Sequence, residues 1–429
     1  MKLFERLFKH ITLAFLLCFF APSTASSPNN EPTLQADSIE ISLLTCGPRQ
    51  QVYSMYGHTA IRFQDKQSGR DIAINYGVFS FDKPFFVLRF VFGLTDYEMG
   101  IAPFDIFEWE YDPTGCGVRQ QVLNLTAQEK MAIAQAVDRN MEPQNRVYRY
   151  NFFYDNCTTR ARDIIANNLN GRIVYDSSTP QHLNTSTPQH HNTPAQYPTF
   201  RNLIHNYNET HRWARFGNDL LLGVKADYNT TFEQQQFLPE RLCADFERAH
   251  IISADGTKRN LVSSSFWLFE PTTKQQSIQQ TNMSILDVFS PLVTFSILSI
   301  LTLIIAIVEY RRKRIIWVFD TIIMLTTGTC GLLLFAMIFS QHPTVSLNLQ
   351  ILLLNPINIF MLYSVTKAAR QNRIHWWTKA WSALILLLLA GSFLQSYAEG
   401  ITIVALSLLL RNISNIYTFK NTGNKQPEA

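Results

Sequence analysis

Strong charge of either sign is missing from this sequence. Its 429 residues include 37 Lys and Arg against 33 Asp and Glu, a formal net charge of only +4. Such a small surplus attracts a polyanion weakly, so the composition does not indicate a nucleic-acid-binding protein. The chain also lacks a glycine-rich phosphate loop and a Cys-x-x-Cys motif, which are the common signals for a nucleotide phosphate site and for a dithiol redox centre.

Cysteine is scarce as well, since the chain has only six. Four of them, Cys46, Cys116, Cys157 and Cys243, lie in the polar first part of the chain. If Cys157 is a free nucleophile, at most one disulfide can form among the other three. A Cys46–Cys116 bond is one pairing, and free buried thiols are the alternative.

The first 25 residues have the composition of a secretory signal. Lys2, Arg6 and Lys9 give a basic start, residues 11–20 are apolar, and residues 23–25 are small enough for cleavage. The apolar stretch is short for a membrane span, which takes roughly 20 residues. We therefore predict a signal peptide over residues 1–25 rather than an uncleaved anchor.

Long apolar blocks dominate the chain only after about residue 285. They lie at residues 288–308, 315–339, 347–365, 381–394 and 401–410. The first three are long enough to cross a bilayer, which takes roughly 20 residues. The last two are shorter, and form either two short spans or one re-entrant hairpin.

Basic residues mark alternate ends of these blocks. They follow the first, third and fifth blocks, whereas the loops 340–346 and 395–400 contain no Lys or Arg. Basic loops stay cytoplasmic, so five spans fit with the first part of the chain outside. We predict an exported domain at residues 26–285, a transmembrane domain of about five helices at 286–413 and a cytoplasmic tail at 414–429.

Within the exported domain, alternating and helical patterns indicate both strands and helices. Strands are predicted at 39–45, 59–63 and 71–81, and a buried strand or short helix is predicted at 85–92. One helix is predicted to follow the capping box of Thr126 and Glu129 and to end at about residue 140. Further helices are predicted at 157–169, 200–222 and 239–251.

A tandem duplication, STPQHLNT followed by STPQHHNT, fills residues 178–193. Its Pro, Thr and Asn content predicts an exposed, poorly ordered loop. A metal site at His182, His190 and His191 is the alternative. The duplication explains these histidines more simply, so we predict no metal there.

Cys157 is the strongest candidate for catalytic chemistry. Asp155 and Asn156 before it are good capping residues, and the residues after it can continue a helix to Gly171. A thiol in a first helical turn lies at the positive end of the helix dipole, which favours the thiolate. The alternative is a buried or disulfide-bonded structural cysteine.

His58 is the candidate proton carrier, because it begins a predicted strand and would form a nucleophile–base pair with the cysteine. Asn75, from the following strand, is the candidate that orients the imidazole. Arg62 and Arg160 are candidates to bind a phosphate or lipid headgroup, with solvated arginines as the alternative. The order of His before Cys with strands between them predicts an α+β fold: a circularly permuted papain-like domain followed by an all-α transmembrane bundle.

Six segments resemble one known family in order and spacing. The segments at 43–47, 56–62, 75–79, 93–97, 122–126 and 150–163 are similar to those of the Lnb family of bacterial lipoprotein N-acyltransferases. The resemblance covers roughly residues 38–260, and the apolar tail is similar to the membrane part of the same family.

The resemblance implies a multi-pass enzyme of the bacterial inner membrane whose N-terminal domain faces the periplasm. It would take an acyl chain from a phospholipid onto Cys157 as a thioester and pass it to the α-amine of a diacylglyceryl-cysteine lipoprotein. His58 would be the general acid and base. The partners implied are the phospholipid donor, the diacylated lipoprotein and the membrane, with no cofactor and no nucleic acid.

Two other functions use the same residues. A periplasmic membrane-anchored thiol peptidase or cell-wall amidase would employ the same pair, although five spans exceed what an anchor needs. A non-catalytic membrane scaffold or sensor would make Cys157 structural.

Overall fold

The computed structural model describes residues 36–49, 51, 54–79, 84–176, 197–272 and 289–419. The predicted signal peptide and the duplicated histidine-containing loop lie outside the described residues.

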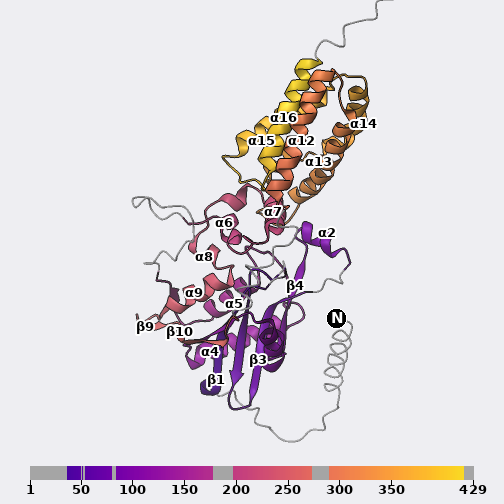
Figure 1. The fold of residues 1–429 in the computed structure, drawn as a ribbon. Helices are drawn as coiled ribbons and strands as arrows, with labels where there is room; N and C mark the ends of the chain where they lie inside the picture. The colour runs from indigo at the N-terminus through magenta and orange to yellow at the C-terminus, as the bar shows by residue number, and fades with distance from the viewer. Residues whose placement is uncertain are drawn as a thin grey trace, which may run out of the picture. The chain divides into compact units, whose positions relative to one another are not determined.

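The first part of the chain is built on a seven-stranded antiparallel sheet (Figure 1). Across the sheet the strands are β10 (Val262–Phe269), β5 (Val118–Leu123), β1 (Ile39–Cys46), β2 (His58–Asp65), β3 (Arg70–Val78), β4 (Asp96–Pro103) and β6 (Val147–Arg149). A smaller sheet contains β7 (Arg172–Val174), β8 (His250–Ile252) and β9 (Lys258–Asn260). The three strands predicted from alternation are confirmed as β1, β2 and β3.

Eight helices of the same part connect or cover the strands in the described residues. They are α2 (Phe86–Val91), α3 (Phe104–Tyr111), α4 (Ala127–Met141), α5 (Cys157–Ala166), α6 (Phe200–His205), α7 (Arg212–Leu221), α8 (Phe232–Gln235) and α9 (Pro239–Arg248). Short 3₁₀ turns add η1 (Ala36–Ser38), η2 (Asp112–Thr114) and η3 (Val224–Asp227). The capping box of Thr126 and Glu129 begins α4 as predicted.

Two of the predicted elements need correction. The helix expected over 200–222 is two helices, α6 and α7, because the intervening residues include Asn206 and Asn208, whose side chains favour turns over helix interiors. The segment 85–92 contains the short helix α2, but it is not buried: Phe85 is 78% exposed and Leu88 57%.

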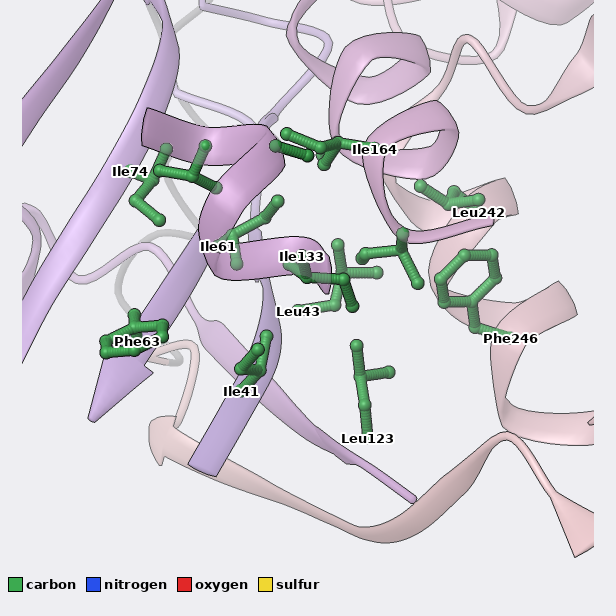
Figure 2. Packing of buried hydrophobic residues seen from close by; sticks show 14 of the residues in the cluster. Ile41, Leu43, Ile61, Phe63, Ile74, Leu123, Ile133, Ile164, Leu242 and Phe246 are labelled. Atoms are coloured by element: carbon green, nitrogen blue, oxygen red, sulfur yellow. The ribbon is translucent and has the colours of Figure 1, made fainter. Parts of the chain in front are cut away.

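The strand side chains alternate between two different cores. On one face Ile41, Leu43 and Ile61 pack with residues of α4, α5 and α9, as Figure 2 shows. On the other face Leu44 and Ala60 pack with aromatic side chains of α3. Burying a side chain of the size of Leu or Ile stabilises a fold by about 1.5–3 kcal/mol. Because β1 and β2 are covered on both faces, the strand that begins with His58 is held firmly.

The second part of the chain is helical. It contains α12 (Pro291–Arg312), α13 (Trp317–Ile338), the 3₁₀ turn η4 (Leu349–Leu352), α14 (Ile357–Arg370), α15 (Trp376–Gly391) and α16 (Ile401–Thr418). Four described helical segments are long and apolar enough to cross a membrane, namely α12, α13, Leu349–Arg370 and α16, whereas the apolar helix α15 has 16 residues. The last two predicted apolar blocks are thus two separate helices.

A buried ion cluster joins three of these helices. Arg411 of α16 donates to Glu309 of α12 at 2.6 Å and to Asp320 of α13 at 2.6 Å. Asn415 also donates to Glu309, at 2.8 Å. Charges within a membrane domain are costly unless they are paired. This cluster therefore fixes which faces of the helices meet.

Polar contacts hold the segment around α7 against η4 and against the loop before α16. The buried guanidinium of Arg201 pairs with Asp219 at 2.7 Å and with Asp227 at 2.8 Å. Gln350 donates to the carbonyl of Asp219 at 2.9 Å, and Gln395 donates to that of Leu222 at 3.0 Å. The end of α7 is therefore tied to η4 and to the loop between α15 and α16.

Candidate active site

Cys157 is the first residue of α5, and its position is fixed by the N-cap before it. The Asn156 side-chain oxygen accepts from the backbone N–H groups of Thr158 at 2.9 Å and Thr159 at 3.0 Å. The amide nitrogen of Asn156 donates to the carbonyls of Phe152 and Phe237, both at 2.9 Å. The predicted cap is confirmed at Asn156. Because the cap is also bonded to Phe237, the start of α5 is fixed to a distant loop.

A pair of buried threonines joins this helix to the strand that carries His58. The hydroxyls of Thr59 and Thr158 lie 3.1 Å apart. His58 itself pairs in register with Cys46, and the chain reaches it through Gly57 at φ 78°, a left-handed conformation that favours glycine. The first residue of β2 is thereby placed beside the first residue of α5.

The sulfur and the imidazole stabilise each other's charged forms. Burial alone would raise the pKa of Cys157, but the charge and hydrogen bond of His58, the backbone N–H of Thr59 and the Thr158 hydroxyl lower it to about 7. Burial alone would lower the pKa of His58, but the charge of Cys157 and its hydrogen bond outweigh this and raise it. A thiolate–imidazolium pair is therefore favoured near neutral pH.

Asn75 lies beside the imidazole, as the sequence predicted. Its side chain interacts with His58 and contributes to the raised pKa of that ring. The Asn75 side-chain oxygen also accepts from the backbone N–H of Gly77 at 2.6 Å. A Cβ at Gly77 would lie 2.8 Å from His58 Cε1 and 3.1 Å from that oxygen, so glycine leaves the space that the ring occupies. The catalytic role of Asn75 stays a prediction.

The two candidate arginines lie outside the pocket that Cys157 lines. Arg62 forms a two-bond pair with Asp71 at 2.9 and 2.5 Å and stacks 3.5 Å above the ring of Phe104. Arg160 pairs with Asp155 at 2.6 and 2.7 Å. Both guanidinium groups are occupied by partners within the fold, so their position gives no support to the predicted binding of a substrate headgroup.

The catalytic cysteine candidate lines a cavity of about 190 Å³ together with His58 and Asn75. The cavity also includes two charged residues that the sequence did not single out as a pair. Arg49 and Glu110 lie 3.6 Å apart on its wall. They are far apart in the chain, and neither belongs to a recognisable motif, so only the fold reveals them.

Tyr56 forms part of the same wall. Its hydroxyl accepts from the Asn218 amide at 2.8 Å, and burial raises its pKa to about 12, so it stays neutral. Its ring lies 4.8 Å from that of Phe152. The sequence placed Tyr56 two residues before His58, but gave no sign of its contact with α7.

All five cysteines among the described residues are free, so the Cys46–Cys116 bond is not formed and Cys157 carries no crosslink. Among those residues, no group of three or more His, Cys, Asp and Glu side chains is arranged to hold a metal ion. The pocket is lined by the Cys157 thiol, the His58 imidazole and neighbouring polar groups.

In the described residues, an α+β domain in which Cys157 and His58 line one cavity precedes four helical segments that are long and apolar enough to cross a membrane. The family model described as the Lnb N-terminal periplasmic domain matches residues 27–203, and that described as the Lnb transmembrane domain matches residues 280–422. The chain belongs to the Lnb family. This membership supports its assignment to the lipoprotein N-acyltransferase class and to the inner membrane. No curated protein and no solved structure matches the chain.

Proposed function

We propose that this protein is a lipoprotein N-acyltransferase that carries its acyl group on Cys157. The observation that supports this most directly is the lowered pKa of that thiol, about 7, beside His58 in a pocket of a membrane protein. A thiolate at neutral pH is a strong nucleophile and forms thioesters, which are reactive acyl carriers. From the family membership we infer that the acyl donor is a phospholipid and that the acceptor is a diacylated lipoprotein.

In the first half-reaction, the Cys157 thiolate attacks the ester carbonyl carbon of the phospholipid. The C–S bond forms, the ester C–O bond breaks, and the His58 imidazolium gives its proton to the departing lysophospholipid oxygen. The backbone N–H of Cys157 lies in the first helical turn, where amides lack an intrahelical acceptor, and it can donate to the oxyanion. The product is an acyl thioester on Cys157.

In the second half-reaction, the α-amine of the diacylglyceryl-cysteine attacks the thioester carbonyl. The amide C–N bond forms, the C–S bond breaks, and His58 accepts the amine proton, so the thiolate–imidazolium pair is restored. Water competes with the amine for the same carbon. The aromatic walls of the pocket, which include Phe152 and Tyr150, limit access of water to the thioester.

Asn75 is proposed to orient the imidazole in both steps. Its side chain interacts with His58 and is itself fixed by the Gly77 backbone at 2.6 Å. A ring held in one orientation delivers its proton to the same place in each cycle. This is a positioning role, because Asn75 acts on the substrate through His58.

The test is conversion of a diacylated lipopeptide by the full-length protein in phospholipid nanodiscs. We expect a product heavier by one acyl chain with the wild type and none above background with Cys157→Ala. Cys243→Ala is the matched control, because it removes another free, buried thiol outside the pocket, and it should retain activity. Undiminished product with Cys157→Ala, or none with the wild type, would contradict the proposal.

A further inference from the structure

A second cavity adjoins the one that contains Cys157. It has a volume of about 390 Å³, within the range of about 300–1,000 Å³ typical of small-molecule pockets. The two cavities share five aromatic wall residues: Tyr56, Phe79, Tyr97, Tyr150 and Phe152. A chain that extends from the Cys157 sulfur past these five rings therefore enters the second cavity.

Beyond the shared rings, the second cavity is lined mainly by apolar side chains. Leu221 and Leu222 come from the end of α7, whereas Met337 comes from the end of α13 and Val345 from the loop after it. Of the polar side chains there, the Asn218 amide already donates to Tyr56 at 2.8 Å. A peptide backbone would lose its hydrogen bonds to water in such a space, whereas a hydrocarbon chain would lose none.

The short helix α2 contributes to the wall of this cavity and has exposed apolar side chains. Phe90 of α2 lines the cavity, and Phe85 and Leu88 near it are exposed. The loop after α13 holds α2 in place, because the Gln341 N–H donates to the Phe92 carbonyl at 3.0 Å. This loop lacks Lys and Arg, as expected at the outer end of a span. Exposed aromatic and leucine side chains at that level favour the bilayer interface.

We propose that the second cavity holds the acyl chain of the phospholipid donor, that the chain enters past α2 from the outer leaflet, and that Leu221, Met337 and Val345 set the chain length accepted. This inference rests on the proposed function. The ester carbon then lies at Cys157 with the hydrocarbon extending toward the membrane helices. The residues that line only this cavity contact the part of the chain farthest from the sulfur.

The test compares two acyl donors in the same detergent micelles. Full-length protein is incubated with dipalmitoyl or dioctanoyl phosphatidylethanolamine, and the acyl adduct on Cys157 is measured by intact mass. Val345→Trp fills the distant part of the cavity. We expect at least tenfold less palmitoyl adduct than in the wild type, with octanoyl adduct within about twofold.

Val365→Trp is the matched control, since Val365 is a buried valine of α14 outside the cavity, and the ratio of the two adducts should stay at its wild-type value. If Val345→Trp does not fold, the ratio of palmitoyl to octanoyl adduct is measured instead in Leu221→Trp, a substitution at a half-buried position. An unchanged ratio in the folded variant would overturn the acyl-chain assignment alone. A wild type that forms no adduct with either donor would overturn the proposed function together with it.

Discussion

Thr59 and Thr158 are 99 residues apart in the chain, yet their hydroxyls lie 3.1 Å from each other in the core. One follows His58 at the start of β2, and the other follows Cys157 at the start of α5. This contact therefore connects the two elements at the point where the proposed proton carrier and nucleophile meet.

Thr59→Val should weaken this connection. Removing one hydroxyl of a buried pair costs up to about 1–3 kcal/mol of unfolding free energy, and the Thr158 hydroxyl then keeps only the Cys157 sulfur, 3.8 Å away, as a partner. Denaturation of the variant should show that loss together with slower alkylation of Cys157. The double variant Thr59→Val with Thr158→Val removes both polar groups, so it should recover most of the stability. A single variant as stable and as reactive as the wild type would show that the hydroxyl pair is unimportant.

The pH dependence of thiol alkylation should report the pairing of Cys157 with His58. Because the pKa of Cys157 is lowered to about 7, the thiolate is present above that pH and is lost as the pH falls through it. Iodoacetamide labelling should therefore reach half its maximal rate near pH 7. In His58→Ala the midpoint should rise to at least about 8.5, the value of an ordinary thiol. A midpoint that does not move in the variant would contradict the pairing.

Gly77→Ala should displace the imidazole, because the added Cβ would lie 2.8 Å from His58 Cε1. Misplacing a catalytic group by about 1 Å can cost about 100-fold in rate. We expect a loss of that order in acyl transfer with little change in thermal unfolding. Gly217→Ala is the control, because a Cβ there meets no atom within 4 Å. Equal activity of the two variants would exclude this role for Gly77.

Arg411→Leu should destabilise the membrane domain. It leaves Glu309 and Asp320 without their buried partner, and breaking a buried ion pair in this way costs about 3–5 kcal/mol. The variant should unfold at a clearly lower temperature in detergent, whereas Arg312→Leu, at an exposed position, should not. Equal unfolding temperatures for the two variants would show that the cluster does not stabilise the helices.

Local features of the site were predictable from the sequence, and contacts between distant segments were not. Asn156 before Cys157 signals a helix start within a few residues, so the placement of the thiol followed directly. Arg62 pairs with Asp71 of the neighbouring strand, and this partner follows only from the register of the two strands. The sequence alone therefore left Arg62 as a candidate to bind substrate. The exposure of Phe85 could not be predicted either, because apolar composition alone does not separate a protein core from a surface that meets lipid.

The second cavity, beside the Cys157 pocket, could be predicted from the sequence even less than these contacts. Its wall combines Tyr56, Leu221 and Val345 from three distant segments. Each is an ordinary apolar or aromatic residue in its own stretch of sequence. Only the folded chain brings them together, because α7 is tied to η4 through Gln350 and to the loop before α16 through Gln395.

The most direct test of the account is intact-mass analysis of full-length protein incubated with phospholipid without acceptor, followed by addition of a diacylated lipopeptide. The account predicts an adduct of one acyl chain on Cys157 that disappears as the triacylated lipopeptide forms. No adduct, or an adduct that the lipopeptide amine does not discharge, would contradict it.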